Sequence, residues 1–219
     1  MNWNIAVPAS FHVARPSGRT VGLVGIVVAA LGILVGVGWL WTTTQQQRGS
    51  SAYAATLLQA RQSETPDAGP QARAAAMSDL ERVLAEYPSN AMAPQAAYAL
   101  GNLRFAAGQY DGARAAWQVA VARAASGTIA TLARAGIGYA WEAERKFPEA
   151  TQAYETALGS LEPADFYYEE LLVDLARAQE LTGKKDAAIA TYRRLLKDVP
   201  KSVRSEEIRN RLASLGAAP

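Results

Sequence analysis

Apolar residues follow two different patterns along the chain. From Thr20 to Trp41 the sequence runs for 22 residues without a charge. Beyond residue 50, apolar residues recur at positions i, i+4 and i+7, which places them on one face of a helix. The first pattern predicts a helix with no polar face. The second predicts amphipathic helices that pack against one another.

The uncharged segment is long enough to cross a membrane. At about 1.5 Å per residue it forms a helix of about 33 Å, and the hydrocarbon core of a bilayer is about 30 Å thick. Trp39 and Trp41 lie at its end, where amphipathic rings favour the headgroup region. A cleaved signal peptide is the main alternative, but its apolar core is only about 7–15 residues long. The small-x-small triplet Ala52-Tyr53-Ala54 also lies well beyond the apolar run. We therefore expect one uncleaved transmembrane helix over residues 20–41.

Basic residues flank this predicted span unevenly. Arg15 and Arg19 precede it, only Arg48 follows closely, and residues 1–50 contain no acid. The positive-inside tendency then predicts a cytoplasmic tail over residues 1–19 and a periplasmic domain over residues 51–219 of a bacterial inner-membrane protein. The polar segment 42–50 is expected to be a linker or a continuation of the helix.

Small residues recur inside the span at a spacing of four. Such pairs let the backbones of two membrane helices approach closely, although glycine is also common in membrane spans in general. The candidate residues for a helix–helix contact are Gly25, Ala29, Gly32 and Gly36.

The rest of the chain repeats one order of residue sizes. A small residue is followed by a large one four positions later, and by an apolar one three positions after that. The order starts at Ala76, Ala113, Ala150 and Ala188, at intervals of 37 to 38 residues. Helix breakers follow each occurrence, at Pro88, Ser126-Gly127, Pro163 and Pro200. The sequence therefore predicts a tandem array of helical hairpins.

Another helix is predicted before each of the last three occurrences of this order, and it forms the first helix of a pair. These first helices carry a small residue in equivalent places, in Leu100-Gly101, Ile137-Gly138 and Leu175-Ala176. Small residues permit close approach to the partner helix, whose large residues (Trp117, Tyr154 and Tyr192) fill the gap between helices.

These residues together resemble the tetratricopeptide repeat, a helix-turn-helix unit of 34 residues. The residues that match it best are Leu100, Gly101, Gly108, Tyr110, Ala113, Trp117 and Ala120. The resemblance covers roughly residues 50–200. It implies an all-α solenoid of about three and a half to four helix pairs. Beyond it, Ser202–Leu215 places Val203, Ile208, Leu212 and Leu215 near one face and has acidic residues before basic ones, so it is expected to be a closing helix that caps the array. The layout of tail, span and array also resembles the ancillary subunits of the bacterial Sec translocon and other periplasmic tetratricopeptide envelope proteins.

The resemblance also implies where a partner would bind. In this family the first helix of each pair lines a concave groove. By that analogy the candidate groove residues are Tyr98, Asn102, Phe105, Tyr139, Glu142, Asp174 and Arg177. Aromatic rings beside a few polar groups suit an extended or helical peptide. For Tyr98 and Phe105, packing between helices is the alternative.

The sequence contains no recognisable catalytic constellation. It has no cysteine and a single histidine, His12, which excludes zinc sites of the usual type and histidine-based triads. Residues 51–219 hold 19 of the 22 basic residues and all 20 acidic ones, so they lack the basic footprint of a nucleic-acid-binding domain. We therefore expect a non-enzymatic protein with no cofactor, metal or small-molecule substrate.

Two hypotheses about function follow. The first is a membrane-anchored interaction module that assists protein translocation or hands polypeptides to periplasmic chaperones. The second is a structural or assembly subunit of a larger inner-membrane complex, whether respiratory, photosynthetic or of the cell envelope. In both cases the partner is a protein, a peptide segment or a membrane-protein complex.

Overall fold

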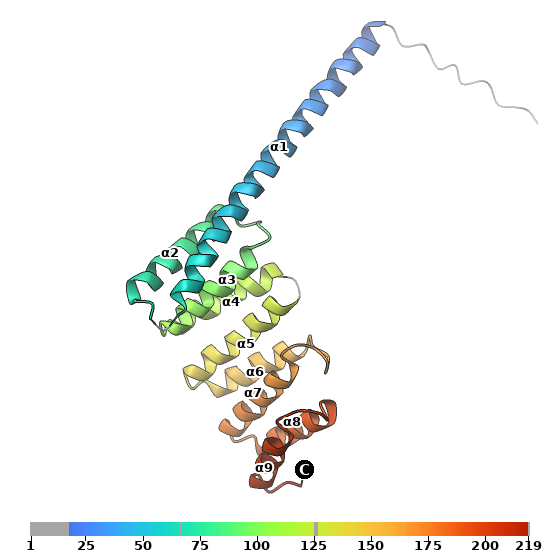
Figure 1. Cartoon of the computed structure of the whole chain (residues 1–219). Helices are drawn as coiled ribbons and strands as arrows, with labels where there is room; N and C mark the ends of the chain where they lie inside the picture. The colour runs from blue at the N-terminus through green and yellow to red at the C-terminus, as the bar shows by residue number, and fades with distance from the viewer. Residues whose placement is uncertain (1–17, 66, 125–126, 219) are drawn as a thin grey trace, which may run out of the picture. The chain divides into compact units, whose positions relative to one another are not determined.

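The computed structural model describes residues 18–65, 67–124 and 127–218, and for residues 18–30 and 41 it describes the backbone alone. Regular structure in these ranges is entirely helical (Figure 1). The chain divides into two compact units, residues 1–45 and residues 46–219. The helices are α1 (Gly18–Ser63), α2 (Pro70–Glu86), α3 (Ala93–Ala106), α4 (Tyr110–Ala124), α5 (Thr128–Ala143), α6 (Phe147–Leu158), α7 (Tyr168–Leu181), α8 (Lys185–Asp198) and α9 (Ser205–Ser214).

The first unit contains the N-terminal part of α1. Residues 20–41, the predicted span, are helical throughout, and so is the polar segment 42–50. Large apolar side chains on this helix are exposed, namely Leu31, Ile33, Leu34, Val35, Val37, Trp39 and Leu40. Counting only residues with described side chains, no helix is long and apolar enough to cross a membrane. Residues 20–30 and 41 of the predicted span lie outside that count.

The candidate helix–helix contact residues divide in the same way. Gly25 and Ala29 lie outside the residues with described side chains. At Gly32 and Gly36 an added Cβ would meet no atom within 4 Å, so nothing within the described structure packs against them. Their role as a contact between membrane helices stays a prediction.

The second unit confirms the predicted all-α array of helical hairpins. Helices α3 and α4, α5 and α6, and α7 and α8 pack as successive pairs, and each pair packs on the next (Figure 1). The end of α1 pairs with α2 in the first repeat, where Tyr53 packs in one buried cluster with Ala76, Leu80 and Val83. The Tyr53 hydroxyl donates a hydrogen bond of 3.0 Å to the Tyr87 carbonyl.

Glycine permits the closest approach between the two helices of a pair. A Cβ added at Gly101 would lie 2.4 Å from Nε1 of Trp117, and one added at Gly138 would lie 2.2 Å from Cε1 of Tyr154. Both aromatic rings are almost fully buried. The predicted match of a small residue on the first helix with a large one on the second is therefore confirmed.

The turn between the two helices of a pair has one conformation in the last three repeats. The residue in the left-handed region is Gly108 (φ 73°), Arg145 (φ 61°) and Gly183 (φ 73°) in turn. In each case the next amide bonds to the carbonyl five residues earlier; Gln109, for instance, donates to Arg104 over 2.8 Å. This is the Schellman arrangement that commonly ends a helix.

The closing helix is shorter than predicted. It begins at Ser205, after the predicted start at Ser202. Ile208 and Leu212 are buried against the array as expected, but Val203 is 98% exposed. Val203 precedes the helix, so helical spacing does not apply to it, and its predicted place on the apolar face was wrong.

Candidate functional site

The seven predicted groove residues form two groups in the structure. The α3 group consists of Tyr98, Asn102 and Phe105 on the first helix of the second repeat. The α5–α7 group consists of Tyr139 and Glu142 on α5, with Asp174 and Arg177 on α7. Six of the seven residues are half-buried, and Asp174 is buried.

The α3 group packs against the second helix of its own repeat. The indole nitrogen of Trp117 donates a hydrogen bond of 3.2 Å to Oδ1 of Asn102. The Phe105 ring lies 5.8 Å from the Trp117 ring and 5.4 Å from the Tyr110 ring. Burial raises the pKa of Tyr98 above its usual value, and a hydrogen bond with Asn102 acts in the opposite direction. These residues therefore serve packing between helices and at the same time expose part of their surface.

The α5–α7 group is a polar network between two repeats. The Tyr139 hydroxyl donates to Oδ2 of Asp174 over 2.7 Å. Arg177 donates to Oδ1 of Asp174 over 2.7 Å and also pairs with Glu142. The side chain of Asp174 is 6% exposed and that of Arg177 is 43% exposed. Burial raises the pKa of Tyr139 far above its usual value, and both Tyr167 and Asp174 add to the shift. The hydroxyl therefore remains a donor at neutral pH.

Two further tyrosines belong to this network. Tyr154 was predicted only as a packing residue, yet its hydroxyl donates to Oε2 of Glu142 over 2.9 Å. The Tyr167 hydroxyl lies 3.0 Å from that of Tyr139. Tyr167 lies in the loop before α7, has φ 74° and follows Phe166, whose side chain is 62% exposed. A bulky residue with positive φ is unusual, and no periodicity in the loop sequence points to it.

One hydrogen bond recurs across the repeats. The aromatic residue of the second helix donates to a polar residue of the first, from Trp117 to Asn102 and from Tyr154 to Glu142. In the last repeat the Tyr192 hydroxyl donates to Oε1 of Glu180 over 2.6 Å. Asn102 and Glu142, which were predicted to line the groove, therefore also accept hydrogen bonds from within their own repeats.

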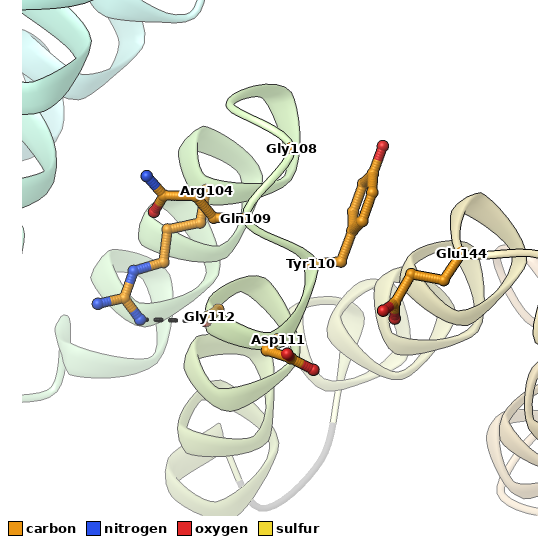
Figure 2. A pocket seen from close by; sticks show the side chains of 7 residues that line it. All are labelled: Arg104, Gly108, Gln109, Tyr110, Asp111, Gly112 and Glu144. Carbon is orange, nitrogen blue, oxygen red and sulfur yellow. Dashed lines mark hydrogen bonds between the residues drawn. The ribbon is translucent and has the colours of Figure 1, made fainter.

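A cavity of about 400 Å³ lies beside the turn between α3 and α4 (Figure 2). Figure 2 shows Arg104 donating to the Gly112 carbonyl, over 3.0 Å; Arg104 also pairs with Glu81 over 2.6 Å. Asp111 and Glu144, which line the opposite side, both pair with the buried Arg114. Each charged residue that lines this cavity is therefore already paired with an oppositely charged residue outside the lining.

Buried Arg114 also joins two repeats. It extends from α4 to Glu144, beyond the end of α5, and its guanidinium carbon lies 3.5 Å from the centre of the Trp141 ring. Burial acts to raise the pKa of Glu144, but hydrogen bonds from Arg114 and Lys146 outweigh it and lower the pKa. Among the described residues, no group of three or more His, Cys, Asp or Glu could hold a metal ion. His12 lies outside those residues.

Several solved structures share this architecture. The MamA protein is 19% identical, with a TM-score of 0.50 over 61% of this chain and 67% of that one. A putative kinesin light chain from Podosopora anserina with nearly identical TPR-like repeats is 18% identical, with a TM-score of 0.56 over 78% of this chain and 86% of that one. The apo form of RapI is 12% identical, with a TM-score of 0.59 over 78% of this chain and 63% of that one. At these identities the likeness concerns the fold alone.

No curated protein matches the sequence significantly. A family model described as "Tetratricopeptide repeat-like domain" matches residues 18–217, which is nearly the whole chain. Such a fold is typically a non-enzymatic scaffold for protein–protein interaction. By its repeats and by this match, the chain belongs to the tetratricopeptide repeat-like domain family.

Proposed function

We propose that this protein is a membrane-anchored interaction module, whose array faces the periplasm and receives polypeptides during translocation or on their way to chaperones. The observation that carries the proposal is the pairing of two features in one chain. One is an array of helical hairpins with half-buried aromatic and polar residues on the first helix of successive repeats. The other is an exposed run of large apolar residues over positions 31–40.

The array supports the choice of a polypeptide as partner. Tyr98, Phe105 and Tyr139 are aromatic residues that are each only half-buried. The neighbouring Arg177 keeps 43% of its side chain exposed, although it pairs with two carboxylates. Aromatic surface beside a few fixed polar groups suits a peptide that contributes both side chains and main-chain hydrogen bonds.

The exposed apolar helix supports a membrane anchor. Leu34 is 68% exposed and Val35 is 71% exposed. Exposure of such apolar surface is unfavourable in water but not in the hydrocarbon core of a bilayer. The basic residues Arg15 and Arg19 before the segment favour a cytoplasmic N-terminus. A protease-accessibility assay on spheroplasts tests this topology, since a protected array would contradict it.

The alternative is a permanent subunit of an inner-membrane complex. It is favoured by Gly32 and Gly36, which carry no side chain and against which no described residue packs, so another membrane helix could lie close. A pull-down in gentle detergent separates the two. Recovery of Sec components supports the translocation role, whereas a stoichiometric unrelated complex contradicts it.

Site-specific photocrosslinking tests the proposed groove. A photoreactive phenylalanine analogue at position 98 or 139 should crosslink to a polypeptide in transit. The same analogue at Gln118, an exposed position on α4, is the matched control. Equal crosslinking from positions 98, 139 and 118 would contradict binding at the groove.

A further inference from the structure

A second cavity, of about 320 Å³, lies where the start of α5 meets the loop between α6 and α7. Thr128, Thr131 and Arg134 line it from α5. They follow one another at intervals of three, so they share one side of that helix. None of them belongs to the groove discussed above. The volume is at the lower end of the range of small-molecule sites, which is about 300–1,000 Å³.

Among the described residues, no side chain caps the helix end in this cavity. The N-cap residue of the 16-residue helix α5 is Gly127, which has no side chain to bond the first amides. The first amides of a helix lack partners within the helix and carry partial positive charge, so they favour an anion.

Thr131 supplies an independent sign of a ligand. It is 6% exposed and lines the cavity, yet its hydroxyl makes no hydrogen bond to any described residue. By contrast, the equally buried Thr151 donates to the Phe147 carbonyl over 2.9 Å. A hydroxyl on a side chain buried to this degree usually has a protein partner, so the unpaired Thr131 hydroxyl in the cavity lining is available to a ligand or to water.

Arg134 gives the cavity a free cation. Within the described structure its one hydrogen bond is a long one, 3.4 Å, to the Ser160 hydroxyl, and it pairs with no carboxylate. By contrast, Arg104, Arg114 and Arg177 each pair with a carboxylate of the protein. The guanidinium of Arg134 is therefore available to an anion from outside.

The loop side of the cavity is apolar, with one acceptor. Leu161 and Phe166 line it, and Phe166 is 62% exposed. Asp165 lines it as well and is held by the amide of Glu162, which donates to its Oδ2 over 2.7 Å. Its other oxygen can accept an N–H from a ligand. The Asp165 charge offsets that of Arg134 and so disfavours a ligand that is anionic throughout.

We propose that this cavity binds a carboxylate attached to an apolar group, namely the free C-terminus of a polypeptide whose last side chain is apolar. The carboxylate lies against the first amides of α5, Thr131 and Arg134. The last side chain lies on Phe166 and Leu161, and a peptide N–H donates to Asp165. The partner class rests on the proposed interaction function, but the site lies outside the groove, so each can fail while the other holds.

Fluorescence anisotropy with the full chain in detergent tests the proposal. The probe is an N-terminally labelled hexapeptide that ends in Ala-Leu, as the free acid or as the C-terminal amide. We expect the acid to bind and the amide to bind at least about tenfold more weakly, because a hydrogen-bonded charge is lost. Equal binding of the two would overturn the site.

Variants locate the binding. Thr131→Val keeps the shape of the side chain and should weaken the acid roughly tenfold, as should Arg134→Met. Phe166→Ala removes the ring on which the last side chain of the peptide lies, so it should weaken binding. Because Phe166 is exposed, the change should leave the fold intact. Thr151→Val is the matched control, since it removes a buried hydroxyl that does not line the cavity. Wild-type affinity in both Thr131→Val and Arg134→Met would overturn the assignment.

Competition identifies the source of the anion. Acetate and inorganic phosphate share the charge but lack the apolar group, so we expect either to displace the labelled acid only at much higher concentration than the unlabelled peptide acid. Displacement by phosphate at the same concentration as the peptide would overturn the assignment to a C-terminus. Loss of crosslinking at position 98, with anisotropy intact, would instead count against the proposed groove.

Discussion

Gly138 lies so close to Tyr154 that the fold has no room for a methyl group there. An added Cβ would be 2.2 Å from Cε1 of a fully buried ring, which cannot move without disturbing its neighbours. We expect Gly138→Ala to lower the free energy of unfolding by about 1–3 kcal/mol through overpacking. Urea denaturation of the chain, followed by circular dichroism, measures this.

Gly159→Ala is the control for that change. Gly159 has φ −63°, and the nearest atoms to an added Cβ are backbone oxygens at 3.6 Å, an ordinary contact. Alanine there should leave stability unchanged or raise it by up to about 1 kcal/mol, because it reduces the freedom of the unfolded chain. Equal losses in the two variants would mean that close approach is not what requires Gly138.

Arg145 occupies a turn position that its two equivalents fill with glycine. Its φ of 61° strains an L-residue by roughly 1–2 kcal/mol, whereas glycine adopts it freely. We expect Arg145→Gly to raise the free energy of unfolding by about 0.5–1 kcal/mol. Arg145→Ala removes the same exposed side chain but keeps the Cβ, so it should bring no gain. A gain of equal size in both variants would mean that removal of the guanidinium group, and not relief of the backbone strain, stabilises the protein.

Sequence spacing accounts for part of this residue-level detail. The small-and-large pairs follow from helical periodicity, so Gly101 with Trp117 and Gly138 with Tyr154 could be predicted. The left-handed Tyr167 and the unpartnered Thr131 could not. Their roles depend on where the loop 159–167 packs, and no helical periodicity extends through that loop.

At the scale of elements, a buried aromatic donor links the two helices in each of the last three pairs. Tyr154 and Tyr192 donate from the second helix to Glu142 and Glu180 on the first. Burial, followed by the neighbouring carboxylate, raises the pKa of both tyrosines far above the usual 10. The sequence predicted the rings as packing residues, but the hydroxyl contacts depend on a rotation between helices that periodicity does not specify.

This arrangement predicts a loss of stability in alkali. Above pH 10 tyrosines ionise in the unfolded chain, while the folded ones keep their protons, so the unfolded state binds fewer protons. The stability from each such tyrosine is fully present below pH 10 and is lost as the pH rises towards the folded pKa, by about 1.4 kcal/mol per pH unit. Urea denaturation between pH 8 and pH 11 measures the slope.

Variants assign the slope to particular side chains. Tyr154→Phe should make the decline shallower by about 1.4 kcal/mol per pH unit, and Tyr192→Phe by a similar amount. Trp117→Phe removes the equivalent hydrogen bond in another repeat, but the indole does not titrate in this range, so the slope should stay as in the wild type. A wild-type slope in both tyrosine variants would contradict the proposed origin.

At the scale of the whole molecule, the architecture could be predicted from the repeat pattern, because the hairpins share one packing rule: a small residue on the first helix lies against a large residue on the second. The closing helix was less predictable, since a helix at the end of an array packs on one side only. Val203 shows this, because it was assigned to a helix that starts at Ser202, whereas the helix starts three residues later, at Ser205, and leaves Val203 exposed. The predicted span rests on an uncharged run, a signal that needs no tertiary context.

The last prediction concerns that span and the array as separate units. If residues 20–41 anchor the protein, charges placed in the exposed apolar run should release it from membranes. Each lysine near the centre of a span costs about 2.5–3.5 kcal/mol on insertion. Ile33→Lys combined with Val37→Lys should therefore move the chain from the carbonate-resistant membrane pellet to the soluble fraction.

The chain itself provides the control. Leu58 lies on the same helix, α1, within the second unit, and is 60% exposed, comparable with Val37 at 59%. If the anchor is confined to the uncharged run, Leu58→Lys should leave the protein in the pellet. Release by both changes would point to a peripheral, surface-bound helix, and retention of the double variant would mean that the array, through a bound partner, holds the chain at the membrane. Only release by the double variant alone agrees with a span that anchors an otherwise independent array.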